Sequence, residues 1–195
     1  MSRVGGVARP KSDDKRDAVV AAATRVIVKQ GLSAPTATIA REAGIANGSL
    51  FTYFETKTDL YNQLYLELKS EMASAALEGL PARAALRSQF LHVWTNWMRW
   101  ALRNPEKRRA LALLGVSDDI TPATRAAGHK TMADLTDLME RSRARGPMRD
   151  APLALVGALM NAVAEATMAF IVNDPSHADQ HAATGFKAVW LMLGG

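Results

Sequence analysis

The sequence predicts an all-α protein of about nine helices. Apolar residues recur at helical spacing along most of the 195 residues, and no segment alternates apolar and polar residues as a half-buried strand would. Gly, Pro or Asn stands where most of these helical patterns stop. A composition of 48% hydrophobic and 22% charged residues is ordinary for a globular protein with a sizeable core.

The N-terminal part is expected to hold a short tail and three helices. Residues 1–11 contain Gly and Pro but no periodic apolar residues, and we interpret them as a flexible basic arm. The first helix should begin at Ser12, whose hydroxyl would cap it ahead of two acids, and end at Gly31. Thr36 should cap or open a second helix, and a third should cover about residues 47–54 with Asn47 as its cap.

The second and third helices have the pattern of a helix-turn-helix, in the stretch TATIAREAGIANGSLFTYFETK. Ala40 is small where two helix backbones would approach closely, and Gly44 can adopt the left-handed conformation that ends a helix. Ser49 and Thr52 would face outward, whereas Leu50, Phe51 and Phe54 are expected in the core. Residues 1–60 carry nine Lys/Arg against six Asp/Glu, which favours a phosphate-facing surface.

The remaining chain is expected to form six longer helices. Thr56 to Asp59 resembles a capping box that starts the first of them. Lys57 in its first turn is unfavourable for the helix dipole unless this helix end meets a phosphate. The expected ranges are 57–79, 81–103, 106–114, 123–145, 151–172 and 176–193.

The expected helix 151–172 is apolar enough to be compared with a membrane span. Asn161 and Glu165 near its middle would be costly in hydrocarbon, so we interpret it as a helix of the core or of a subunit interface. The chain has no cysteine, and its N-terminus has no apolar segment of the kind found in signal peptides. We therefore expect a cytoplasmic protein with no membrane association.

Residues 16–60 resemble the DNA-binding head of the TetR family of transcriptional regulators. The matching positions are Arg16, Gly31, Ile39, Ala40, Ala43, Gly44, Gly48, Ser49, Leu50, Phe51, Tyr53, Phe54, Lys57 and Leu60. The resemblance implies a helix-turn-helix domain over residues 12–56 and a helical domain over residues 57–195 that binds a ligand and dimerises. It also implies a homodimer that binds a palindromic operator in double-stranded DNA, with repression relieved by a small-molecule effector.

The resemblance also indicates which side chains would line the DNA surface. They are Thr36, Asn47, Gly48, Ser49, Thr52, Tyr53 and Lys57. Three departures from the family pattern stand beside them. Phe51 replaces the commoner tyrosine and lacks its hydroxyl, Ala37 and Thr38 offer no long basic side chain, and Ala46 replaces a capping serine. These departures predict a head with few direct base contacts.

Two apolar groups of residues carry the expectations for the second domain. An apolar effector pocket is predicted from side chains that suit adaptable binding, although aromatic residues at helical spacing are more often core. These residues are Trp94, Trp97, Met98, His129, Met132 and Met160. The dimer interface is predicted from apolar positions of the last two helices, namely Leu155, Leu159, Val163, Phe170, Phe186, Val189 and Trp190.

The sequence shows no recognisable pattern of catalytic residues. It shows no paired nucleophile and base, no glycine-rich phosphate loop and no carboxylate pair, so we expect neither an enzyme nor a cofactor. His177 and His181 have the spacing of a metal chelate, but no third ligand stands out and no metal site is expected. The alternatives are a regulator controlled by a partner instead of a ligand, and a helical small-molecule-binding protein whose head does not read DNA.

Overall fold

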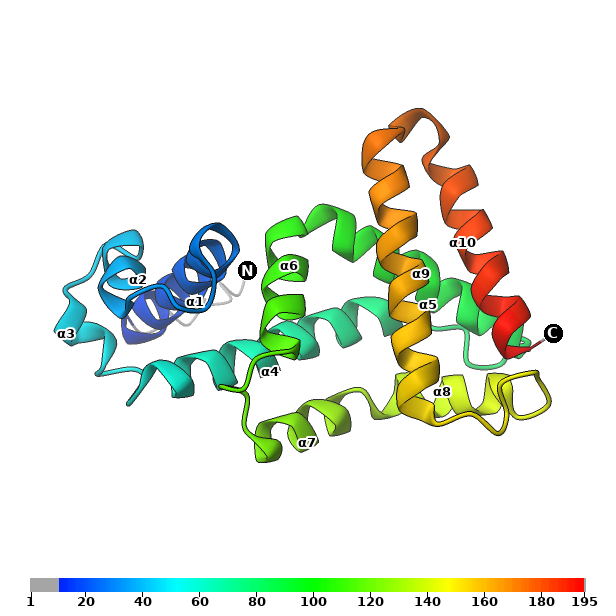
Figure 1. The fold of residues 1–195 in the computed structure, drawn as a ribbon, viewed down its shortest axis with the longest axis horizontal. Coiled ribbons are helices and arrows are strands. Elements are labelled where there is room, and N and C mark those ends of the chain that lie inside the picture. Colours follow the sequence, from blue (N-terminus) through cyan, green and yellow to red (C-terminus); the bar gives the residue numbers. More distant parts are fainter. Residues whose placement is uncertain (1–10, 195) are drawn as a thin grey trace, which may run out of the picture. The chain divides into compact units, whose positions relative to one another are not determined.

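The computed structural model describes residues 11–194, which form ten α-helices and one short 3₁₀ helix (Figure 1). The all-α prediction is confirmed, and no strand occurs within these described residues. The helices are α1 (Lys11–Gln30), α2 (Thr36–Glu42), α3 (Asn47–Leu50), α4 (Lys57–Leu77), α5 (Leu86–Arg103), α6 (Pro105–Gly115), α7 (Pro122–Thr131), α8 (Ala133–Arg143), α9 (Leu153–Asn173), η1 (Pro175–His177) and α10 (Ala178–Leu193).

The expected helix 123–145 is interrupted at Met132, which separates α7 from α8. Met132 has φ −94° and ψ 9°, and its N–H donates to the carbonyl of His129 at 3.0 Å, a tighter turn than the α-helical one. No Gly or Pro lies between His129 and Asp134, so the sequence carried no signal for this break.

The expected helix from residue 81 begins only at Leu86. The side-chain amide of Gln89 donates to the carbonyls of Ala82 at 3.2 Å and Ala84 at 2.7 Å. These bonds hold the carbonyls of the turn before α5, and no side chain caps this helix.

The chain divides into two compact units, which we describe separately. Unit 1 contains the residues up to Glu67 together with Glu106–Arg125, and unit 2 contains Leu68–Pro105 together with the residues from Ala126 onward. All three tyrosines (Tyr53, Tyr61 and Tyr65) belong to unit 1, and all four tryptophans (Trp94, Trp97, Trp100 and Trp190) belong to unit 2.

The core of unit 1 is formed by the apolar stripe of α1 and the apolar faces of α2, α3 and the first half of α4. In α1 the predicted stripe is buried, and α1 packs on α2, which packs on α3. The buried residues are Val19, Ala22, Ala23, Val26, Ile27, Ile39, Ala40, Leu50, Phe54, Leu60, Tyr61, Leu64 and Tyr65.

Two consecutive residues of α4 connect other segments of unit 1. The hydroxyl of Tyr61 donates to the carbonyl of Leu32 at 2.9 Å, just after α1. The amide of Asn62 donates to the carbonyl of Asp119 at 2.8 Å, and its oxygen accepts from the N–H of Thr121 at 3.0 Å. Buried on α4, these two side chains fix the end of α1 and the loop between α6 and α7 to the same helix.

Arg16 ties the start of α1 to the next turn of α4. Its guanidinium donates to Gln63 Oε1 at 3.0 Å, forms an ion pair with Glu67, and lies over the ring of Phe54 at 5.5 Å. Since Phe54 follows α3, this arginine contacts both the helix-turn-helix and α4.

The core of unit 2 packs α5 against α8, α9 and α10, and α9 and α10 run side by side as a hairpin (Figure 1). The indole N–H of Trp94 donates to the carbonyl of Ala182 at 3.0 Å. At Gly185 an added Cβ would lie 2.2 Å from Thr167 Oγ1 and 2.9 Å from the Trp94 ring. Only glycine therefore allows α10 to approach α9 and α5 this closely.

The helix α9 is long and apolar enough to cross a membrane, judged by length and composition alone, and no other helix among residues 11–194 is. Only 28% of its most apolar window is buried within this chain. Leu155, Leu159, Phe170 and Val172 are exposed along it. Much of this apolar surface is therefore uncovered in a single copy of the chain.

We expect Tyr61→Phe to lower the free energy of unfolding by about 1 kcal/mol, because the carbonyl of Leu32 loses its donor. Burial, helped by the charge of Asp119, raises the pKa of Tyr61 from 10.0 to about 12. The folded state holds the phenol proton more tightly than the unfolded state does. Tyr61 therefore adds to the free energy of unfolding in full below the unfolded pKa, and this stabilisation is lost as the pH rises through the folded pKa. Urea unfolding followed by circular dichroism gives the free energy of unfolding at neutral pH and at about pH 11. Between these two pH values it should fall less in the variant than in the wild type. Equal losses in both proteins would contradict the assignment.

Candidate nucleic-acid interface

The turn between α2 and α3 is a helix C-terminus closed by a glycine. Gly44 has φ +70°, and its N–H donates to the carbonyl of Arg41 at 3.1 Å. The N–H of Ile45 donates to the carbonyl of Ala40 at 3.0 Å. This pair of bonds is the Schellman arrangement, and it confirms the predicted role of Gly44.

The predicted caps of the first and third helices are wrong. α1 already includes Lys11, so Ser12 lies within the helix and not at its cap position. α2 begins at Thr36 as expected, but the cap position is Pro35 and no side chain bonds there. α3 is capped by Ala46 in an extended conformation, so Asn47 is its first residue and not its cap. The amide of Asn47 is thus not used in starting the helix, and Asn47 is exposed.

The outward face of α3 and of the turn after it carries four of the predicted DNA-contacting residues. Asn47, Gly48, Ser49 and Thr52 are exposed. Among the other three, Thr36 at the start of α2, Tyr53 after α3 and Lys57 at the start of α4 are each half-buried.

The expectation that three apolar residues of this segment are core is right for two of them. Leu50 and Phe54 are buried, with 0% and 1% of their surface exposed. Phe51 is 43% exposed, so its assignment to the core is wrong. The helical spacing of Leu50 and Phe54, four residues apart, already fills the inward face, and Phe51 falls outside it.

Nothing in the described part of the chain requires glycine at position 48. Its φ does not lie in the left-handed region, and an added Cβ would meet no heavy atom within 4 Å. A glycine in a helix costs about 1 kcal/mol relative to alanine. Its presence therefore suits a surface that another molecule approaches closely.

The start of α4 is fixed by the predicted cap at Thr56, and the return bond of the capping box reaches one residue further, to Glu55. The N–H of Asp59 donates to Thr56 Oγ1 at 3.0 Å, and the carboxylate of Asp59 accepts from the N–H of Glu55 at 3.3 Å. Lys57 directs its ammonium over the ring of Tyr61 at 5.3 Å. The ring holds the charge at the first turn of α4, beside the end of the helix-turn-helix.

An ion pair holds α2 against α1. Arg25 Nε lies 2.7 Å from Glu42 Oε1, and this hydrogen bond is the main reason that the pKa of Glu42 lies below its usual range. The pair is partly exposed, so it fixes geometry more than it adds stability.

The residues predicted to line an effector pocket differ in burial. Trp94 and Met98 are buried in the core of unit 2, with Trp97 and Met160 half-buried against it. His129 is exposed on α7, and Met132 is half-buried at the break before α8. One surface hollow of about 170 Å³ lies elsewhere in unit 2, lined by Ala75, Glu78, Asn96, Arg99, Trp100, Arg103 and Asn104.

The residues predicted for the dimer interface divide into three groups. Leu155, Leu159 and Phe170 are exposed on α9. Phe186 and Val189 are buried within the chain, so their assignment to an interface is corrected: they are core residues of unit 2. Val163 and Trp190 are half-buried and pack against this core.

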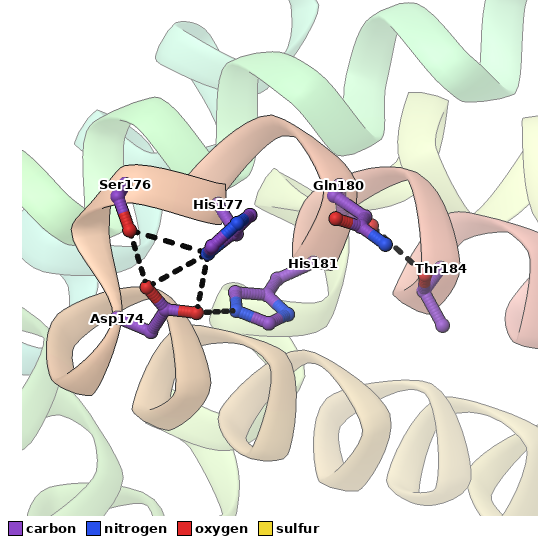
Figure 2. A network of polar contacts seen from close by, with 6 residues as sticks. All are labelled: Asp174, Ser176, His177, Gln180, His181 and Thr184. Atoms are coloured by element: carbon purple, nitrogen blue, oxygen red, sulfur yellow. Dashed lines mark hydrogen bonds and ion pairs between the residues drawn. The ribbon is translucent and has the colours of Figure 1, made fainter.

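His177 and His181, whose spacing would suit a metal chelate, both hydrogen-bond to the carboxylate of Asp174 (Figure 2). Asp174 Oδ2 is 2.9 Å from His177 Nδ1 and 3.1 Å from His181 Nε2, and Asp174 Oδ1 accepts from the hydroxyl of Ser176 at 2.7 Å. These hydrogen bonds, first that of Ser176, hold the pKa of Asp174 below its usual range. The network stabilises the turn between α9 and α10.

A family model described as bacterial regulatory proteins of the tetR family matches residues 19–64. A tetR family transcription regulator from Shewanella sp. PV-4 is 29% identical, with a TM-score of 0.80 over 90% of this chain and 96% of that one. One from Marinobacter aquaeolei VT8 is 23% identical, with a TM-score of 0.82 over 92% and 95%. FadR from Bacillus subtilis in complex with stearoyl-CoA is 16% identical, with a TM-score of 0.66 over 92% and 98%. The similarity of fold thus extends over both units.

The two glycines of the helix-turn-helix should respond differently to the same substitution. Gly44→Ala should lower the free energy of unfolding by about 1–2 kcal/mol, because alanine is strained at positive φ. Gly48→Ala should leave it unchanged or raise it by up to about 1 kcal/mol, because alanine favours the helix and has open space. Urea unfolding followed by circular dichroism measures both. A loss of stability in Gly48→Ala would contradict our interpretation of this position.

Proposed function

Because this chain belongs to the TetR family of bacterial regulatory proteins and is a transcriptional regulator, we propose that it is a ligand-responsive repressor. In this proposal a homodimer binds a palindromic operator in double-stranded DNA and is released by a small, largely apolar effector. The observation that carries the DNA-binding part is the outward face of α3, where Gly48 leaves open space between exposed small polar side chains.

The helix-turn-helix supports binding of α3 in the major groove. Ser49 and Thr52 have hydroxyls that can bond phosphates or base edges, and Asn47 has a free amide at the start of the helix. Thr36 and Tyr53 would contact phosphates from the two ends of the motif. Lys57, held at the first turn of α4, would meet a phosphate together with the N-terminal dipole of that helix.

The exposed apolar face of α9 supports a dimer. Leu155, Leu159 and Phe170, which share one side of the helix, form the surface that we propose a second copy covers. The half-buried Val163 and Trp190 would border it. Such a dimer can place two copies of α3 about 34–36 Å apart, one turn of DNA.

The effector proposal rests on the chemistry of unit 2. Trp94, Trp97, Met98 and Met160 offer aromatic and thioether surface, and His129 and Met132 are proposed to extend the site toward α7. The stearoyl-CoA complex of the Bacillus subtilis protein is consistent with an apolar effector, on the same fold. Since α4 belongs to both units, a shift of its second half can reach the head. A coupling of about 1–3 kcal/mol would suffice for a switch.

Three substitutions test DNA binding, using an operator selected from random duplexes. Lys57→Ala should weaken binding about equally on all sequences and flatten the logarithmic salt dependence by about one unit. Ser49→Ala should alter the sequence preference, and Gly48→Ala should weaken binding of a fully folded protein. Gel-shift titrations at stated salt measure all three. A wild-type protein that shifts no duplex would contradict the proposal. Identical effects of the three substitutions on affinity, salt dependence and sequence preference would contradict the separate roles given to Lys57, Ser49 and Gly48.

A charge in the apolar face of α9 tests the dimer. Phe170→Glu, at a side chain that is 64% exposed, should yield a monomer, because a carboxylate cannot be buried against a second apolar face. Val116→Glu is the matched control, since Val116 is 83% exposed but lies in unit 1. Sedimentation equilibrium measures the mass, and circular dichroism verifies folding. A folded Phe170→Glu protein that remains dimeric would place the interface elsewhere.

A further inference from the structure

We propose that Phe51 reads a thymine of the operator by contact with its 5-methyl group. This inference rests on the proposed DNA binding and names a specificity-determining residue within it. It starts from the finding that a large apolar side chain expected in the core is 43% exposed on the segment that carries the proposed contacts.

The exposure of Phe51 is a consequence of the local backbone. Phe51 continues the turn of α3 with φ −73° and ψ −5°, and Leu50 and Phe54 occupy the inward face. No side chain stands at Gly48, three residues earlier, and the position of its missing Cβ has no heavy atom within 4 Å. The ring of Phe51 therefore does not fold back over Gly48, and the surface beside it stays open.

The chemistry of the exposed ring limits what it can recognise. Phenylalanine has no hydrogen-bond donor or acceptor, so it cannot bond a phosphate or a polar base edge. Its neighbours Ser49 and Thr52 can supply such bonds. Among the groups that base pairs present in the major groove, the thymine methyl is the apolar one. Contact with it would remove apolar surface of both partners from water and would favour thymine over cytosine.

The test removes the methyl group without changing the base pairing. Each thymine of the selected operator is replaced in turn by deoxyuridine, symmetrically in both half-sites, and binding is titrated by gel shift. For one thymine position, wild-type protein should lose roughly fourfold in affinity per half-site, the value of one buried methyl-sized group. Phe51→Ala should bind the operator more weakly but bind the thymine and deoxyuridine duplexes equally.

Two variants serve as controls. Phe51→Leu retains apolar contact and should keep part of the preference for thymine, whereas Leu113→Ala shortens another exposed apolar side chain of unit 1 and should keep all of it. If deoxyuridine weakens wild type and Phe51→Ala equally at every position, or if Phe51→Ala weakens binding to operator and random duplex equally, the inference is wrong while the proposed function stands. A wild type that binds no duplex overturns both.

Discussion

The first turns of α4 are the constraint on which unit 1 depends. Tyr61 bonds the end of α1, Asn62 bonds the loop between α6 and α7, and Gln63 accepts from Arg16 at the start of α1. Three neighbouring residues thus join segments that are far apart in the sequence. A four-residue helix such as α3 has little stability of its own. It keeps a defined position because Leu50 and Phe54 anchor it to a core that α4 holds together.

Those parts of the fold that depend on local chemistry could be predicted from the sequence. The apolar stripe of α1, the left-handed Gly44 and the capping box at Thr56 each follow from residues within a few positions of one another. The break at Met132 could not be predicted, because no helix-breaking residue marks it. The cap of α3 was misplaced by one residue, since the extended backbone of Ala46 starts the helix without any side-chain bond.

The sequence could not predict which surface covers an apolar residue. Phe186 and Leu155 both stand on apolar helix faces, yet one is buried within the chain and the other is exposed. Periodicity shows that a side chain needs cover but not whether the same chain provides it. Phe51 illustrates the same limit in the candidate site: an aromatic residue beside two core residues was assigned to the core, and only the structure shows it at the surface.

The segregation of aromatic residues gives this protein two intrinsic optical labels. With every tyrosine in unit 1 and every tryptophan in unit 2, red-edge excitation selects indole emission from the second unit alone, while phenol emission comes only from the first. Transfer of excitation from phenol to indole then depends on the separation of the units. Movement of one unit against the other can thus be followed by spectroscopy on the unmodified chain, without any attached dye.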